Sequence, residues 1–499
     1  MALTSIIDLS NKRPRAFVRV TLGAGPRASG AAPITILLVG NKAAVTPSDP
    51  LADDTMEAVF DEDTVIAKAG AGSELHRMYL QVTAINNQAS VYIGAVAASA
   101  GAQAALTKTL TGTATADSTL EVTIGPDTPL SVAVLNGDTA ATVIAAIIAA
   151  VNAVPETPVI ASTPATNLVF TAKCTGPRGN DIRIRTRWVG GSTGAGLTYT
   201  AAASGEALTG GTTNDDPTAL LANTTSVRFH LTVIPYGDTA EATAIGVCQA
   251  HVLAQMGPLI GKRGRLILGN QEAAGTANTF AFTDVNDELA QVSWMNVANE
   301  TPAELAASLA GRLTVGLGVT RRYNFDGEVL TGITPPWASA NHPTETEITS
   351  ALNNGLTALF VSGNEVQVSR SITSKSRTAA GGSTFDYSVL DSHYVDVAFF
   401  VADLIEENFG PAFPNFALGV DIAGEVPPRD VATANSVRSW ALGLLAPLDN
   451  DLIENFTATT VGASIFERNE VAKGRVDAVV PIDVIELFHQ FAPDVRQVG

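Results

Sequence analysis

The chain has 499 residues, of which 46% are hydrophobic and only 16% are charged, against about 25% charged residues in a typical soluble domain. At about 100–200 residues per domain, this length predicts about three folded domains. The net charge of −19 repels phosphate groups and argues against direct nucleic-acid binding. The low charged fraction fits large buried contacts between subunits, and a composition rich in alanine, glycine and threonine explains it about equally well.

The two cysteines, Cys174 and Cys248, form no CxxC pair, so buried free thiols in a reducing cytoplasm are expected. The N-terminus lacks a charged segment followed by an apolar one, and no signal peptide is predicted. The most apolar run, 143–151, is much shorter than the roughly 20 residues that cross a bilayer, so no membrane insertion is expected. We therefore predict assembly in the cytoplasm.

Residues 1–32 are predicted to form an extended N-terminal arm, because prolines and glycines surround a single alternating piece. This piece consists of Phe17, Val18, Arg19 and Val20. It indicates one strand without a sheet of its own.

Continuous apolar runs, typical of strands covered on both faces, follow from residue 33. They lie at 34–40, 91–93, 231–234, 265–268 and 292–295. Two helices between and after these runs begin at capping signals, Asp238 with Glu241 and Thr301 with Glu304. Alternating strands and helices predict an open, mostly parallel α/β domain formed by 33–102 and 215–340.

Residues 103–214 interrupt this alternation and are predicted to form an inserted β-rich domain. The composition turns to threonine, glycine and alanine, with period-two strand patterns and one amphipathic helix around 143–151. The basic run 183–187 alternates with isoleucines, which favours the solvated face of a strand over a phosphate-binding site.

A C-terminal α+β domain is predicted for 341–474. Thr344 and Glu347 form a capping box, 357–361 and 365–370 form a hairpin, and a long helix with an apolar stripe starts near Tyr394. Residues 475–499 are predicted to form a C-terminal strand and arm with no obvious sheet of their own. The strand candidates there are Val484, Ile485, Glu486, Leu487 and Phe488.

Motifs that would indicate an enzyme or a cofactor site do not fit their templates. The glycines of 23–30 precede the first core strand, and 257–263 has the wrong spacing for a P-loop and Arg263 where Ser or Thr must bind magnesium. The six histidines show no metal-ligand spacing, and no glycine-flanked serine nucleophile occurs. Adjacent Glu406 and Glu407 diverge on a helix, which favours a solvated face. We expect no enzyme activity and no cofactor.

Several segments, in this order, resemble the contractile phage tail sheath family, which includes the sheaths of related injection systems. They are 233–264, 301–306, 330–336, 344–356, 364–374 and 385–391, followed by the long helix. The resemblance implies an α/β and α+β multidomain protein, with an α/β domain of subtilisin-like topology and extended terminal arms. The insert resembles an outward-facing domain of some sheaths.

The resemblance also implies a function in the virion tail. Sheath subunits form stacked hexameric rings around an inner tube, and the stack contracts to drive the tube through the host envelope. The implied partners are further copies of the chain, the inner tail tube protein, and baseplate and tail terminator proteins. Terminal strands donated to neighbouring subunits would keep the rings attached, and about twenty extended residues reach roughly 65–70 Å.

Two other functions stay open. A non-contractile coat or surface-layer protein would form only one kind of polymer in electron micrographs, whereas a contractile sheath forms two lengths. A hydrolase or nucleotide-dependent enzyme on the α/β domain would turn over generic ester or nucleotide substrates.

Overall fold

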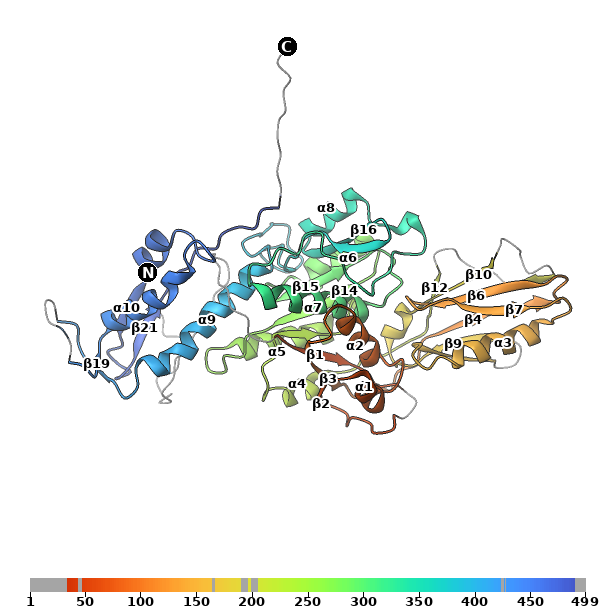
Figure 1. The fold of residues 1–499 in the computed structure, drawn as a ribbon, viewed down its shortest axis with the longest axis horizontal. Coiled ribbons are helices and arrows are strands. Elements are labelled where there is room, and N and C mark those ends of the chain that lie inside the picture. Colours follow the sequence, from red (N-terminus) through yellow and green to blue (C-terminus); the bar gives the residue numbers. More distant parts are fainter. Residues whose placement is uncertain are drawn as a thin grey trace, which may run out of the picture. The chain divides into compact units, whose positions relative to one another are not determined.

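The computed structural model describes residues 34–43, 47–163, 167–189, 196–198, 205–422, 426 and 428–489 (Figure 1). The predicted strand at Phe17, Val18, Arg19 and Val20 lies outside them. The chain divides into two compact units. The sheet unit comprises Ala32–Val315 and Gly327–Leu390, and the C-terminal unit comprises Met1–Ala31, Gly316–Asp326 and Asp391–Gly499.

An eight-stranded sheet with the strand order β17-β16-β15-β14-β13-β1-β3-β2 forms the centre of the sheet unit. Its strands are β1 (Thr35–Gly40), β2 (Thr55–Val59), β3 (Ser90–Ala95), β13 (Leu231–Val233), β14 (Arg265–Asn270), β15 (Ala290–Trp294), β16 (Leu356–Ser362) and β17 (Glu365–Val368). The six inner strands pair in parallel, and β2 and β17 pair antiparallel at the two edges. All side chains of β14 and β15 are buried, as the continuous apolar runs predicted. The mixed α/β prediction is confirmed.

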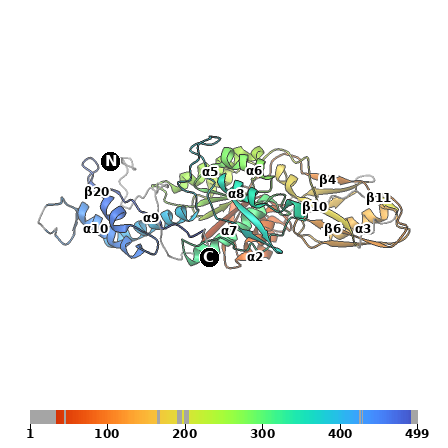
Figure 2. The ribbon, with the colours of Figure 1, turned by 90° about the horizontal axis from the view of Figure 1, so that it is seen from above.

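Helices cover both faces of this sheet. They are α1 (Glu62–Ala69), α2 (Glu74–Ile85), α4 (Thr218–Asn223), α5 (Ala242–Met256), α6 (Ala274–Phe280), α7 (Pro302–Val319) and α8 (Glu345–Asn353). Figure 2 shows α5 and α6 on one side of the sheet and α2 and α7 on the other. The capping box at Thr344 is present, and Thr301 exchanges hydrogen bonds with Glu304 in the same way.

The sheet continues past the predicted domain boundary at residue 340. The predicted hairpin exists as β16 and β17, but β16 pairs with β15 and so extends the central sheet. Backbone N–H groups of Gly327 and Leu330 donate to the carbonyls of Val368 and Val366, which covers part of the β17 edge. The prolines at 335 and 336 therefore mark a loop within the unit.

The insert, residues 103–214, contains antiparallel sheets and one long helix, α3 (Ala140–Asn152). Its strands are β4 (Ala105–Lys108), β5 (Thr111–Gly112), β6 (Ser118–Ile124), β7 (Leu130–Val134), β8 (Val159–Ser162), β9 (Leu168–Ala172), β10 (Arg183–Trp188), β11 (Leu197–Thr198) and β12 (Glu206–Ala207). A separate cluster of buried side chains, which includes Phe170, forms its hydrophobic core. The basic run is solvated only in part, because Arg183 and Arg185 are half-buried and Arg187 is exposed.

The C-terminal unit is built on two helices, α9 (His393–Ala412) and α10 (Ala434–Leu445). Its short strands are β18 (Ala417–Leu418), β19 (Val431–Ala432), β20 (Ile465–Arg468) and β21 (Val476–Val479). Leu445, Leu452 and Ile453 are buried together beneath α9 residues such as Val401. The expectation that the segment after residue 475 lacks a partner strand is wrong, because β21 pairs antiparallel with β20.

Candidate functional site

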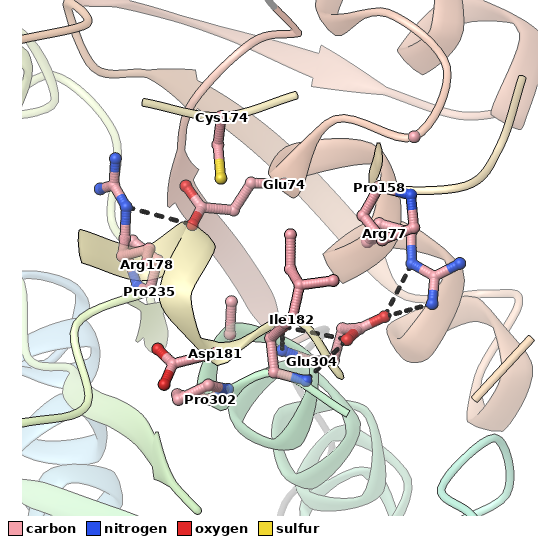
Figure 3. A pocket seen from close by; sticks show the side chains of 13 residues that line it. Glu74, Arg77, Pro158, Cys174, Arg178, Asp181, Ile182, Pro235, Pro302 and Glu304 are labelled. Atoms are coloured by element: carbon pink, nitrogen blue, oxygen red, sulfur yellow. Dashed lines mark hydrogen bonds and ion pairs between the residues drawn. The ribbon is translucent and has the colours of Figure 1, made fainter. Parts of the chain in front are cut away.

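The insert meets the central sheet at a cavity lined by charged side chains, which we call the joint (Figure 3). Three elements converge there: the start of α2, the short helical turn Pro177–Asp181 of the insert, and the start of α7. The enclosed space is about 30 Å³. This is room for about two water molecules, and far less than a substrate pocket of several hundred Å³ requires.

Arg178 of the insert reaches into the sheet side of the joint and is only 4% exposed. Its Nε lies 3.3 Å from Glu74 Oε1, and its Nη2 donates to Asn41 Oδ1 at 2.6 Å and to the Asp215 carboxylate. The guanidinium also lies 5.4 Å from the ring centre of Tyr236. Burial raises the pKa of Glu74, and the positive charge of Arg178 opposes that effect. The charged state of Glu74 therefore depends on its contact with Arg178.

Arg77 of α2 makes the opposite connection, from the sheet to the insert. Its Nε donates to Glu304 Oε1 at 2.7 Å, and its Nη1 donates to Asp127 Oδ1 of the insert at 2.5 Å. The other oxygen of Glu304 accepts the N–H of Thr301 in the α7 cap. Each side of the joint thus contributes one buried arginine to a carboxylate of the other side, and this exchange defines the relative orientation of the insert and the sheet.

Lysine and glutamine side chains add two further links. Lys173 Nζ donates to the carbonyls of Ala71 at 3.1 Å and of Pro155, and burial lowers its pKa to about 8. Gln271 Nε2 donates to Asp181 Oδ1 at 2.9 Å, and burial raises the pKa of Asp181 to about 7. Each link joins a residue of the insert to a residue of the sheet.

Backbone packing at the joint is also close. Gly72 has a φ of +70°, and a Cβ on it would lie 2.2 Å from the carbonyl oxygen of Thr157 in the insert. Glycine is therefore required for both the backbone conformation and the approach of the two parts.

The ionisable groups at the joint hold its parts together and are poorly suited to catalysis. Burial raises the pKa of the Cys174 thiol to about 12, so it is protonated at neutral pH and is a poor nucleophile. Glu74 and Glu304 are both engaged by arginines. Within the described residues, no cluster of three or more His, Cys, Asp or Glu side chains is suited to a metal ion. The charged groups at the joint are thus engaged mainly with one another.

Glu300, next to α7, fastens the 330–336 motif to the same region. Its Oε1 accepts hydrogen bonds from the backbone N–H of Thr334 at 2.7 Å and from the Thr334 hydroxyl at 2.8 Å. Burial raises the pKa of this carboxyl to about 8. The folded protein therefore retains a proton on Glu300 that the unfolded chain loses near the ordinary value of 4.5.

Replacing Glu300 with glutamine is expected to reduce the pH dependence of stability. Because the folded state binds the extra proton, the free energy of unfolding falls as pH rises from about 5 to about 8, by about 1.4 kcal/mol per unit for one group. Glu300→Gln should remove this contribution, as measured by urea denaturation at several pH values. Glu365→Gln, which alters an exposed glutamate, is the control. If the free energy of unfolding changed equally with pH in the wild type and in Glu300→Gln, the raised pKa of Glu300 would be contradicted.

The predicted strand-donation residues have different positions. Phe17, Val18, Arg19 and Val20 lie outside the described residues, and the structure holds one chain, so donation stays a prediction. Val484 is buried and forms an antiparallel bridge with Ile453 of its own chain. Ile485 and Leu487 are half-buried, whereas Glu486 and Phe488 are exposed.

Sequence analysis missed the arginines of the joint. Arg77 and Glu304 lie 227 positions apart, and no local pattern connects them. The capping signal at Thr301 identified Glu304 as a helix-start residue, and this was the only available hint.

The sequence also predicted buried free thiols at Cys174 and Cys248, and this prediction is confirmed. Across the described part of the chain, every helix is too short or too polar to span a bilayer.

A family model and a relative that match this chain both describe phage tail sheath proteins. Residues 210–374 match the family described as phage tail sheath protein central domain. The matched region contains strands β13 to β17. The tail sheath protein of the Mu-like prophage FluMu from Haemophilus influenzae is 23% identical over 393 residues, which cover 78% of each chain.

Two solved structures are similar at low identity. The sheath tail protein from Desulfitobacterium hafniense shares 15% identity, with a TM-score of 0.45 over 94% of this chain and 100% of that one. The sheath tail protein from Listeria innocua shares 14% identity, with a TM-score of 0.48 over 92% and 94% of the two chains.

Proposed function

We propose that this chain, which is a phage tail sheath structural protein, is the subunit of a contractile sheath. Its copies form hexameric rings that stack around an inner tail tube, between a baseplate and a tail terminator, in the virion tail. Contraction of the stack drives the tube through the host envelope. The observation that carries this proposal is the match of the sheath central domain to 210–374, which includes five of the eight strands of the central sheet.

The energy for contraction is stored during assembly. Because the joint offers no room for a nucleotide and its charged groups bind one another, the proposal requires no nucleotide cycle at this site. The extended polymer is metastable, and the contracted polymer buries more surface between subunits. The insert and the sheet turn as one body during this change, since two buried arginines hold them together.

Donated strands keep the subunits attached while these bodies move. The donors are the N-terminal Phe17, Val18, Arg19 and Val20 and the C-terminal Val484, Ile485, Glu486, Leu487 and Phe488. The receiving surface is the β20–β21 sheet of a neighbouring copy. This sheet has only two strands among the described residues, and two-stranded sheets are marginally stable unless further strands or packing support them. An added strand would satisfy edge N–H and C=O groups.

Electron microscopy of the purified protein tests the function. We expect hollow tubes after concentration, and a shorter and wider form after mild heating or dilute urea. Tubes of a single length under every condition would favour the non-contractile coat. Absence of tubes together with hydrolysis of ester or nucleotide substrates would favour an enzyme.

A further inference from the structure

The C-terminal segment lies along the hydrophobic core of its own unit. Val480, Ile482 and Val484 alternate along the segment, as residues on one side of a strand do. The first two pack against the cluster that contains Leu452 and Ile453, and Val484 is 4% exposed. Val484 also forms the antiparallel bridge with Ile453. The alternating apolar side chains that pack this segment onto its own subunit are therefore the ones that a donated strand would pack onto a neighbour.

Polar contacts fix the register of this segment. The carbonyl of Asp483 accepts the N–H of Glu454 at 3.1 Å, and its carboxylate accepts a hydrogen bond from Asn455 Nδ2 at 2.7 Å. Asn455 has a φ of +52°, a conformation that asparagine tolerates better than most residues. The turn at 454–455 is thus shaped to hold Asp483.

His489 fastens the far end of the segment. Its Nδ1 lies 2.5 Å from Asp326 Oδ2, and its Nε2 lies 3.5 Å from Asp391 Oδ1. The two carboxylates come from separate stretches of the C-terminal unit. A protonated ring is attracted to both carboxylates. The ring is only 12% exposed, so water screens this attraction little.

We propose that residues 480–489 form a self-clasp that holds the C-terminal segment on its own subunit until a neighbouring copy releases it. This inference rests on the proposed function, because release has a purpose only if the segment is donated. Phe488, which belongs to the clasp and is 77% exposed, offers the incoming copy an apolar side chain. Release frees ten residues, or about 33 Å of extended chain, for pairing with a neighbour. The clasp therefore delays polymerisation of free subunits.

Two substitutions in the full-length protein test the clasp. His489→Asn and Asp326→Asn each remove one partner of the Asp326–His489 contact and preserve a polar side chain. Hydrogen exchange of the 482–489 amides, measured in dilute unassembled protein, should be about tenfold faster in both variants. Lys473→Gln is the matched control, because it removes an exposed charge elsewhere in the same unit. The same variants should show a shorter lag before tubes appear.

The outcomes separate the clasp from the proposed function. Wild-type exchange rates in both variants would overturn the clasp, whatever the assembly assay shows. Faster exchange with an unchanged or longer lag would overturn its role in delaying polymerisation. Faster exchange, with no tubes from either the wild type or the variants, would support the self-contact and count against the sheath function.

Discussion

Replacing Arg178 with methionine is expected to lower the free energy of unfolding by about 3–5 kcal/mol, the range for breaking a buried ion pair from one side. The substitution preserves much of the side-chain volume but leaves the carboxylates of Glu74 and Asp215 in a buried site without their cation. Part of this penalty is relieved when Glu74 takes up a proton, since burial already raises its pKa. Urea denaturation followed by circular dichroism measures the effect.

The matched control for this substitution is Arg187→Met in the same insert. Arg187 pairs with Glu121 but is 58% exposed, so water and salt screen the interaction and a loss of about 0–1 kcal/mol is expected. Proteolysis of the native protein provides a second measurement, because loosening of the joint should expose the 211–216 connection to cleavage. Equal destabilisation by the two substitutions would show that the joint adds nothing beyond a surface ion pair.

Deleting residues 1–22 is expected to abolish sheath formation and to leave the monomer folded. The deletion removes Phe17, Val18, Arg19 and Val20, the proposed donor strand, and leaves the sequence of both hydrophobic cores unchanged. Without the donated strand, neighbouring subunits lose a set of backbone hydrogen bonds that holds them together. Sedimentation and electron microscopy measure assembly, and circular dichroism measures folding. Normal tubes from the truncated protein would refute the donor assignment.

Point substitutions in the same arm separate loss of pairing from loss of length. Val18→Pro removes one backbone donor and should impair assembly, whereas Val18→Thr retains a strand-forming side chain and should assemble normally. If both variants assembled equally well, the arm would act as a spacer and not as a strand.

If the sheath contracts as proposed, the joint determines how the insert moves. The insert has its own hydrophobic core, and the side chains of Arg77, Arg178 and Gln271 bond it to the sheet. Apolar packing tolerates small rotations. Buried pairs of arginine and carboxylate specify one arrangement, because each charged group loses its partner when the insert turns relative to the sheet. We therefore expect the insert to follow the sheet unit as a rigid extension in both sheath states.

Local features of this fold could be predicted from sequence because their causes are local. The apolar run at 34–40 and the Thr344 capping box each form with residues close by in the chain, and both are present in the structure. The inner parallel sheet followed from the alternation of such runs with helices. The order of the sequence motifs carried the resemblance to phage tail sheath proteins.

Long-range pairing was decided only by the tertiary structure. β16 joined the central sheet, β20 paired with β21, and Arg77 met Glu304 and Asp127 across the joint. These partners are not defined by local periodicity or by spacing along the chain. Burial makes the pairing of Arg77 and Arg178 obligatory, since a buried charge without a partner is costly, and burial exists only once the insert and sheet have packed.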